Sequence, residues 1–253
     1  MPTRIILFAL MFHACLLRAE AVPLRVGVED ASPPKWLDYV GERPRGFCAD
    51  LLALLMVMQP TLAFQISPGA VPQKRMEIDL QEGRIDLICG LTRTPQRAAL
   101  FHYAEPAIYA LDYVLFARSD DPVAPRTWDD VRALGPGGVI LLNYDSPAVG
   151  RLQRLGGLQL DATARTIEQN LRKLHSGKGR FFFYHRPGGM EEINRLKLSH
   201  SLRVVEPAFD RQPFHVLVGR HVPLPQREQL EEALRALEAS GRLKDLQQHW
   251  SMQ

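Results

Sequence analysis

The sequence predicts an α/β protein of two similar lobes joined by two extended crossings. Segments with strand character alternate with segments of helical period over residues 24–91, and the alternation repeats over residues 127–205. Residues 85–91 are almost continuously apolar, which is typical of a strand covered on both faces of a parallel sheet. Residues 110–118 and 214–218 are apolar, extended stretches at the two ends of the second half. We expect a cleft between the lobes to be the natural binding site.

The first half shows a β-α-β-α-β order, which places its strands in one parallel sheet. The expected strands are 24–28, 62–66 and 85–91, and the expected helices are 50–58 and 76–82. The helix over 50–58 has a broad leucine face and stops before Pro60.

The second half repeats this alternation. The expected helices are 127–134, 146–155, 165–175 and 191–198, and the expected strands are 138–143, 158–161, 180–184 and 202–205. Two carboxyl-terminal helices, 224–239 and 242–250, are split at Ser240-Gly241 and are expected to return to the first lobe. The predicted division is residues 22–110 and 214–253 for lobe 1 and residues 111–213 for lobe 2.

Composition favours a soluble protein that binds a small molecule. The 253-residue chain has a net charge of +3, and its basic residues are interleaved with acids. No basic stripe indicates nucleic acid or a membrane surface as a partner. The chain has no C-x-x-C, no H-E-x-x-H and no paired histidines, so we expect no metal and no cofactor. We expect a monomer.

Residues 1–21 have the pattern of a secretory signal peptide. Arg4 supplies positive charge, residues 5–17 are apolar apart from His13, and Ala19-Glu20-Ala21 is an A-x-A cleavage site. This predicts a periplasmic protein that starts at Val22 after cleavage.

Two cysteines, Cys48 and Cys89, remain after this cleavage. They could pair in an oxidising compartment, because the fold brings a helix start near a neighbouring strand end. Both lie in apolar runs, however, where a free cysteine behaves as a small hydrophobe. We therefore expect them to be unpaired.

A cluster of polar groups follows the apolar run 85–91. Thr92, Thr94, Pro95 and Arg97 come within six residues, and Thr94 can cap a helix whose first position suits Pro95. Open α/β sheets bind ligands beyond the carboxyl ends of their strands, so this edge offers N–H groups, hydroxyls and a guanidinium to a ligand. Such a cluster suits a carboxylate.

The same stretch resembles a known family. The order G-x-x-D, a short strand, G-x-T-x-T-P-x-R and aromatic-x-x-P is the signature of the periplasmic solute-binding proteins of the amino-acid type (bacterial extracellular solute-binding proteins, family 3), the receptors of ABC importers. The matching residues are Gly83, Asp86, Gly90, Thr92, Thr94, Pro95, Arg97, Tyr103 and Pro106. The resemblance covers nearly the whole mature chain. It implies a type II periplasmic-binding-protein fold, with two three-layer αβα lobes, and ABC permease subunits as partners.

The resemblance also implies roles for single residues. In that family the arginine matched by Arg97 grips the ligand's α-carboxylate with both arms, and the hydroxyl matched by Thr92 assists. A planar guanidinium suits such two-point binding of a carboxylate. Gly90, the glycine of the motif, is also expected to be a ligand-binding residue. The alternative is a surface arginine paired with Glu105, which the position of Arg97 at a strand-to-helix junction disfavours.

Two further candidates follow the first strand, at the same sheet edge. Glu29 is a candidate cleft acid, as is its neighbour Asp30, although solvation in a loop is the common explanation for such a pair. Trp36 could form an apolar wall for the ligand or cover the core.

The second lobe departs from its relatives. In amino-acid receptors a strand after a Gly-x-x-Asp turn delivers an aspartate that binds the ligand's ammonium. Here Arg180 replaces the turn aspartate and His185 falls at the ligand aspartate. Tyr184 or His185 could still hydrogen-bond a ligand, and the histidine would make affinity pH-sensitive near neutrality. The alternative is a core strand over 181–184 followed by a solvated His185.

Residues 143–146, Asn-Tyr-Asp-Ser, match a segment in which relatives use a hydroxyl and helix-start amides. Ser146 would cap a helix and present N–H groups to an anion. Asp145 could receive a cation or merely complement the positive helix end.

These observations predict a receptor that captures a small carboxylate-bearing solute, an amino acid or related organic acid, for an ABC importer. No catalysis is required, so we expect a protein that is not an enzyme. One alternative is a dehydratase-like enzyme on the same fold, with His185, Glu29 or Asp145 as general acid or base. Another is an accessory or sensory protein that binds a partner with the same lobes.

Overall fold

A computed structural model describes residues 22–30, 34–40 and 43–252. The predicted signal peptide over residues 1–21 lies outside the described residues, so its assignment stays a prediction. Within the described residues, no helix is long and apolar enough to cross a membrane.

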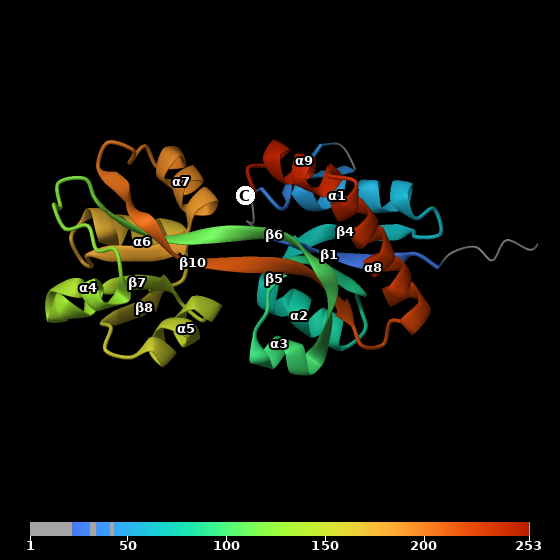
Figure 1. The fold of residues 1–253 in the computed structure, drawn as a ribbon, viewed down its shortest axis with the longest axis horizontal. Coiled ribbons are helices and arrows are strands. Elements are labelled where there is room, and N and C mark those ends of the chain that lie inside the picture. Colours follow the sequence, from blue (N-terminus) through green and yellow to red (C-terminus); the bar gives the residue numbers. More distant parts are fainter. Residues whose placement is uncertain (1–21, 31–33, 41–42, 253) are drawn as a thin grey trace, which may run out of the picture.

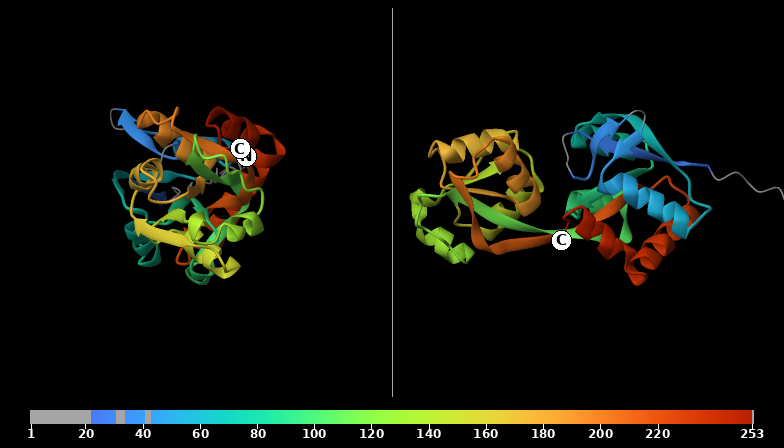
Figure 2. Two further views of the ribbon diagram at one scale, coloured as in Figure 1. Left: turned by 90° about the vertical axis from the view of Figure 1, so that its left-hand side faces the viewer. Right: turned by 90° about the horizontal axis from the view of Figure 1, so that it is seen from above.

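Two lobes lie side by side and are joined by two long strands (Figure 1). These strands are β6 (Phe101–Arg118) and β10 (Leu202–Gly219), which pair antiparallel over most of their length. Seen from above in Figure 2, they run along one side of the junction. The two-lobed α/β fold is therefore confirmed, whereas the predicted lobe boundaries fall inside β6 and β10 and stay predictions.

The first lobe is built on a parallel sheet with helices on both faces. Its strands are β1 (Leu24–Glu29), β4 (Phe64–Val71) and β5 (Leu87–Thr92), in the order β4-β1-β5. Its helices are α1 (Phe47–Met58), α2 (Gln73–Gln81), α3 (Pro95–Leu100), α8 (Leu224–Ala239) and α9 (Arg242–His249). Leu51, Leu234 and Leu243 bring α1, α8 and α9 into one core, while Met76 and Leu80 of α2 pack in another.

The second lobe repeats the plan. Its strands β7 (Ile140–Asn143), β8 (Leu160–Ala164) and β9 (Phe181–His185) follow β6 in the order β9-β7-β8. Its helices are α4 (Trp128–Ala133), α5 (Pro147–Leu155), α6 (Ile167–His175) and α7 (Arg186–Arg195), with a 3₁₀ turn, η1 (Gly135–Gly138), after α4. Leu152 of α5 packs with Phe183, and Leu171 of α6 packs with Phe182, because alternate residues of β9 face opposite sides.

Several features differ from the sequence prediction, among them the start of β6 at Phe101. Residues 202–205 and 214–218 belong to one strand, β10. A small hairpin of β2 (Leu37–Val40) and β3 (Arg43–Arg45) precedes α1. Helix α7 begins at Arg186 and not at residue 191, because the His185 ring caps it and Pro187 fits its first turn.

The prediction that the cysteines stay unpaired is wrong. Cys48 at the start of α1 and Cys89 in β5 form a disulfide, with Cα atoms 6.0 Å apart. Both side chains are buried, so their apolar surroundings did not argue against pairing. The disulfide fixes the start of α1 to the strand that leads to Thr92.

Candidate functional site

The carboxyl ends of strands from both lobes meet at the junction. Burial raises the pKa of Tyr184 in β9, and the negative charge of Glu29 at the end of β1 adds to this rise. Burial lowers the pKa of His185, the last residue of β9, and the positive charge of the Lys35 ammonium lowers it further. Residues of the first lobe thus lie close to the strand ends of the second lobe.

Arg97 is anchored at the end of β5. Thr94 caps α3 by accepting a hydrogen bond from the Arg97 backbone N–H (3.1 Å), as predicted. The Arg97 side chain turns back, and Nη1 donates to the Thr92 carbonyl (2.9 Å) and to Thr92 Oγ1 (3.3 Å). Arg97 and Thr92 are both buried, so the structure brings the two predicted carboxylate ligands together.

Arg97 does not pair with Glu105. Its Nη2 donates to Glu77 Oε1 at 2.9 Å, and Glu105 instead pairs with the half-exposed Arg93 at 2.6 Å. The alternative of a surface arginine on Glu105 is therefore wrong. Glu77 comes from α2, twenty positions away in the sequence, and no motif indicated it.

The Arg97 guanidinium retains donors for a further acceptor. Arginine carries five N–H groups, and its side-chain bonds to Thr92 and Glu77 use three. Burial raises the pKa of Tyr113 in the second-lobe part of β6, while the positive charges of Arg151 and Arg97 oppose that rise. The positive charge of Arg97 in the first lobe therefore affects the pKa of Tyr113 in the second-lobe part of β6.

A partly buried ion pair lies against β5. The Lys35 ammonium pairs with Glu29 and lies 3.4 Å from the Gly90 carbonyl oxygen. Gly90 has φ = +78°, and a Cβ there would lie 2.4 Å from the Tyr109 hydroxyl oxygen and 3.0 Å from Lys35 Cδ. Only glycine fits this position, because both the backbone angle and the close contacts exclude a side chain. The sequence indicated Glu29 and Gly90 but not Lys35.

Trp36 belongs to the core. Its side chain is buried among the residues of the main hydrophobic cluster, so the core alternative holds. Asp30, the neighbour of Glu29, is exposed.

His185 is a partly buried helix cap. Its Nδ1 accepts a hydrogen bond from the Gly188 backbone N–H (3.1 Å). Burial, with a smaller effect of Lys35, lowers the pKa of His185 to about 3. The ring is neutral at pH 7, so the expected pH-sensitivity of binding near neutrality does not come from this residue. Of the alternative's core strand over 181–184, Phe181–Phe183 are buried and Tyr184 is partly buried. The alternative's solvated His185 is wrong, because the ring is partly buried and caps α7.

Ser146 stands where predicted but does not cap through its side chain. It is the N-cap residue of α5, yet its hydroxyl makes no capping hydrogen bond. Asp145 is exposed and has φ = +55°, a left-handed conformation that aspartate tolerates. Neither residue is brought to Arg97 by any described contact.

The sequence missed Arg151 of α5. Its guanidinium carbon lies 4.9 Å from the centre of the Tyr113 ring, and its Nε lies 3.2 Å from Asp210 Oδ2. The side chain is 19% exposed, and both Nε and Nη2 are fully buried without a hydrogen-bond partner. Nothing in the helical pattern of residues 147–155 distinguished this arginine from Arg154.

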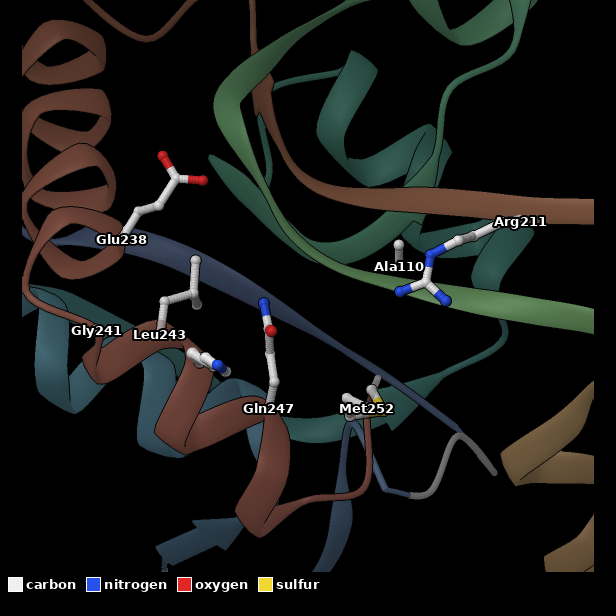
Figure 3. Close-up of a pocket in the computed structure, with 8 residues that line it drawn as sticks. Ala110, Arg211, Glu238, Gly241, Leu243, Gln247 and Met252 are labelled. Atoms are coloured by element: carbon white, nitrogen blue, oxygen red, sulfur yellow. The ribbon is translucent and has the colours of Figure 1, made fainter.

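A pocket distinct from these residues lies near the crossing strands. It has a volume of about 480 Å³ and lies between the crossing strands and the carboxyl-terminal helices (Figure 3). Ala110 and Arg211 line it from the strands, and Glu238, Leu243 and Gln247 line it from the helices. None of the predicted site residues lines this pocket. Over the described ranges, no cluster of three His, Cys, Asp or Glu side chains could hold a metal ion.

Comparison with protein-family models identifies one family. The model of the bacterial extracellular solute-binding proteins, family 3, matches residues 24–253. A comparison with curated protein sequences gave no match.

Solved structures with the same fold include sensors and transport proteins. A histidine kinase sensor domain with similarity to periplasmic binding proteins is 22% identical, with a TM-score of 0.74, over 92% of this chain and 97% of that one. A probable amino-acid ABC transporter extracellular-binding protein from Bacillus subtilis is 13% identical, with a TM-score of 0.75, over 91% and 97%. An ancestral amino-acid-binding protein, a precursor of cyclohexadienyl dehydratase, is 15% identical, with a TM-score of 0.70, over 90% and 94%.

Proposed function

Because the chain belongs to the bacterial extracellular solute-binding proteins, family 3, we propose that it captures a small carboxylate-bearing solute between its lobes and delivers it to an ABC importer. We place it in the periplasm, in keeping with the predicted signal peptide. The ligand is an amino acid or a related organic acid, and permease subunits of the importer are the partners.

The observation that carries this proposal is the setting of Arg97. A buried guanidinium held at the end of β5 by Thr92, with N–H groups to spare, is suited to a carboxylate. Glu77 already accepts one hydrogen bond from Arg97, so a ligand carboxylate must share the guanidinium with Glu77 or displace it. Rotation of one lobe against the other about β6 and β10 would enclose the ligand.

The three candidate acid–base residues support binding over catalysis. The His185 ring is a poor base because its pKa is about 3, and its Nδ1 is used as a helix cap. Glu29 is paired with Lys35, and Asp145 is exposed.

A thermal-shift screen tests the proposal. Amino acids, dicarboxylates and aromatic acids are added to the wild-type protein and to Arg97→Met. A ligand present at one hundred times its Kd stabilises the folded protein by about 2.7 kcal/mol. For a chain of this size, that corresponds to a rise in Tm of roughly 5–10 °C. We expect such a rise for at least one carboxylate with the wild type and none with Arg97→Met.

Arg93→Met is the matched control. Arg93 lies four residues before Arg97, but its side chain is half exposed and pairs with Glu105. We expect this variant to respond like the wild type. A carboxylate that stabilises Arg97→Met and wild type equally would leave the fold standing and refute Arg97 as the anchor. Copurification with a sensor protein and not with a permease would reassign the partner.

A further inference from the structure

Arg151 has a buried hydrogen-bonding edge with no acceptor. Its Nε and Nη2 are both fully buried without a hydrogen-bond partner, although the guanidinium also interacts with the Tyr113 hydroxyl. Leaving charged donors buried and unpartnered costs free energy, so such a group in a folded protein calls for a specific explanation.

Two other arginines of the chain show which acceptor binds the Nε–Nη2 edge of a guanidinium. Arg25 donates from Nε and Nη2 to the two carboxylate oxygens of Asp86, at 2.8 and 2.7 Å. Arg180 does the same to Asp121, at 2.8 Å for each bond. The two N–H groups on this edge are parallel and match the two oxygens of a carboxylate. The missing partner of Arg151 therefore has the geometry of a carboxylate.

The neighbouring acid does not fill this role. Asp210 Oδ2 lies 3.2 Å from Arg151 Nε, but the contact is not a hydrogen bond, and Nη2 has no acceptor at all. Both carboxylate oxygens of Asp210 accept instead from Gln212 Nε2, at 2.8 and 2.7 Å. Asp210 thus balances the charge of Arg151 without occupying its paired donors.

Arg151 and Arg97 also share a neighbour, Tyr113. Arg151 projects from α5 of the second lobe and lies 4.9 Å from the Tyr113 ring. The Tyr113 hydroxyl also experiences the positive charge of Arg97 from the first lobe. One tyrosine on a crossing strand therefore has an arginine from each lobe nearby.

We propose that the solute carries two carboxylates, one bound by Arg97 of the first lobe and the other by the Nε–Nη2 edge of Arg151 in the second. The inference rests on the proposed function and narrows its ligand to a dicarboxylate. Each lobe then supplies one arginine, so the enclosed ligand links the two lobes directly.

Titration calorimetry at pH 7 tests this with defined probes. Succinate, glutarate and adipate are compared with butyrate, valerate and hexanoate, and with glutamate and glutamine. We expect the wild type to bind at least one of the dicarboxylates ten or more times more tightly than the monocarboxylate of the same length. Arg151→Met should weaken dicarboxylate binding at least tenfold and change monocarboxylate binding less than twofold. Arg97→Met should weaken both.

Three variants separate the explanations. Arg151→Lys keeps the charge but not the paired donors, so it should also lose at least tenfold. Arg154→Met, at an exposed position on the same helix, should match the wild type. Asp210→Asn should bind the dicarboxylate within threefold of the wild type.

The outcomes against the proposal are distinct. Equal dicarboxylate affinity in Arg151→Met and wild type would show that Arg151 serves only Asp210, and would overturn the inference. A glutamine or monocarboxylate preference that depends on Arg97 but not on Arg151 would overturn it while leaving the proposed function intact. No binding of any of these probes would overturn the inference, whereas the proposed function is decided separately by the wider thermal-shift screen. If the Arg151 variants do not fold, the wild type still tests the inference. Equal affinity for each dicarboxylate and the monocarboxylate of the same length would overturn it.

Discussion

At the scale of single residues, buried and partly buried charged side chains of the first lobe occur in pairs. Lys35 pairs with Glu29 and Arg97 with Glu77. Burying a charge is costly unless an opposite charge and hydrogen bonds compensate for lost water. The first lobe therefore balances the charge of Arg97 while leaving N–H groups of its guanidinium for a ligand.

His185 gives a pH prediction because its partly buried ring carries no proton at neutral pH. Its folded pKa of about 3 lies below the ordinary value near 6.5, since burial disfavours the charged ring. The unfolded chain then binds a proton that the folded chain does not, so the stabilising contribution is complete above pH 6.5 and is lost as the pH falls toward 3. The loss amounts to about 2 kcal/mol between pH 6.5 and 4.5.

His185→Asn isolates this effect. Asparagine is a good N-cap, so the variant keeps a hydrogen-bond acceptor for the Gly188 N–H but cannot titrate. We expect urea unfolding between pH 4.5 and 6.5 to show a shallower loss of stability than in the wild type, by about 2 kcal/mol over that interval. Carboxylates titrate in both proteins and cancel in the comparison. Parallel curves would show that His185 is not a buried neutral group.

At the scale of elements, helix starts hold the site residues in place. Thr94 caps α3 and so fixes the backbone from which Arg97 turns back to Thr92. The disulfide between Cys48 and Cys89 joins the start of α1 to β5, one residue before Gly90. Rigid strand and helix ends are therefore expected to keep the carboxylate site formed in the free protein.

Removal of this disulfide should destabilise the protein. The double variant Cys48→Ala/Cys89→Ala frees a loop with a sequence separation of 41 residues, and we expect the free energy of unfolding to fall by about 2–5 kcal/mol. Alanine suits both buried positions because it adds no polar group. Chemical denaturation under oxidising and reducing conditions measures the effect.

A reductant is the internal control for that experiment. It should lower the stability of the wild type toward that of the double variant and leave the double variant unchanged. Equal stability of the oxidised wild type and the double variant would mean that the bond contributes nothing to folding.

At the scale of the whole molecule, sequence pattern was sufficient for the fold. The apolar run of β5 and the Thr94-Pro95 helix start are local signals, and the structure has both. Two extended crossings were expected, and they exist as parts of β6 and β10, although these strands extend further than their apolar stretches. The Arg-Pro-Gly-Gly start of α7 was missed because those residues usually favour turns and helix ends.

The sequence predicted only those contacts of the site that join residues close together in the chain. Arg97 and Thr92 are five residues apart, and the strand-to-helix turn between them dictates their contact. Glu77 and Arg151 join the junction through tertiary packing of α2 and α5, which leaves no pattern in a single sequence. Ser146 shows the converse, because a residue type suited to capping does not guarantee the bond.

The most direct test of the central claim is a calorimetric titration of the best carboxylate into Arg97→Lys and Arg93→Lys. Both substitutions keep the positive charge and remove the planar pair of donors, but only Arg97 is buried at the end of β5. The account predicts at least a tenfold loss of affinity for Arg97→Lys and wild-type affinity for Arg93→Lys. Unchanged affinity in Arg97→Lys, or an equal loss in both variants, would contradict it.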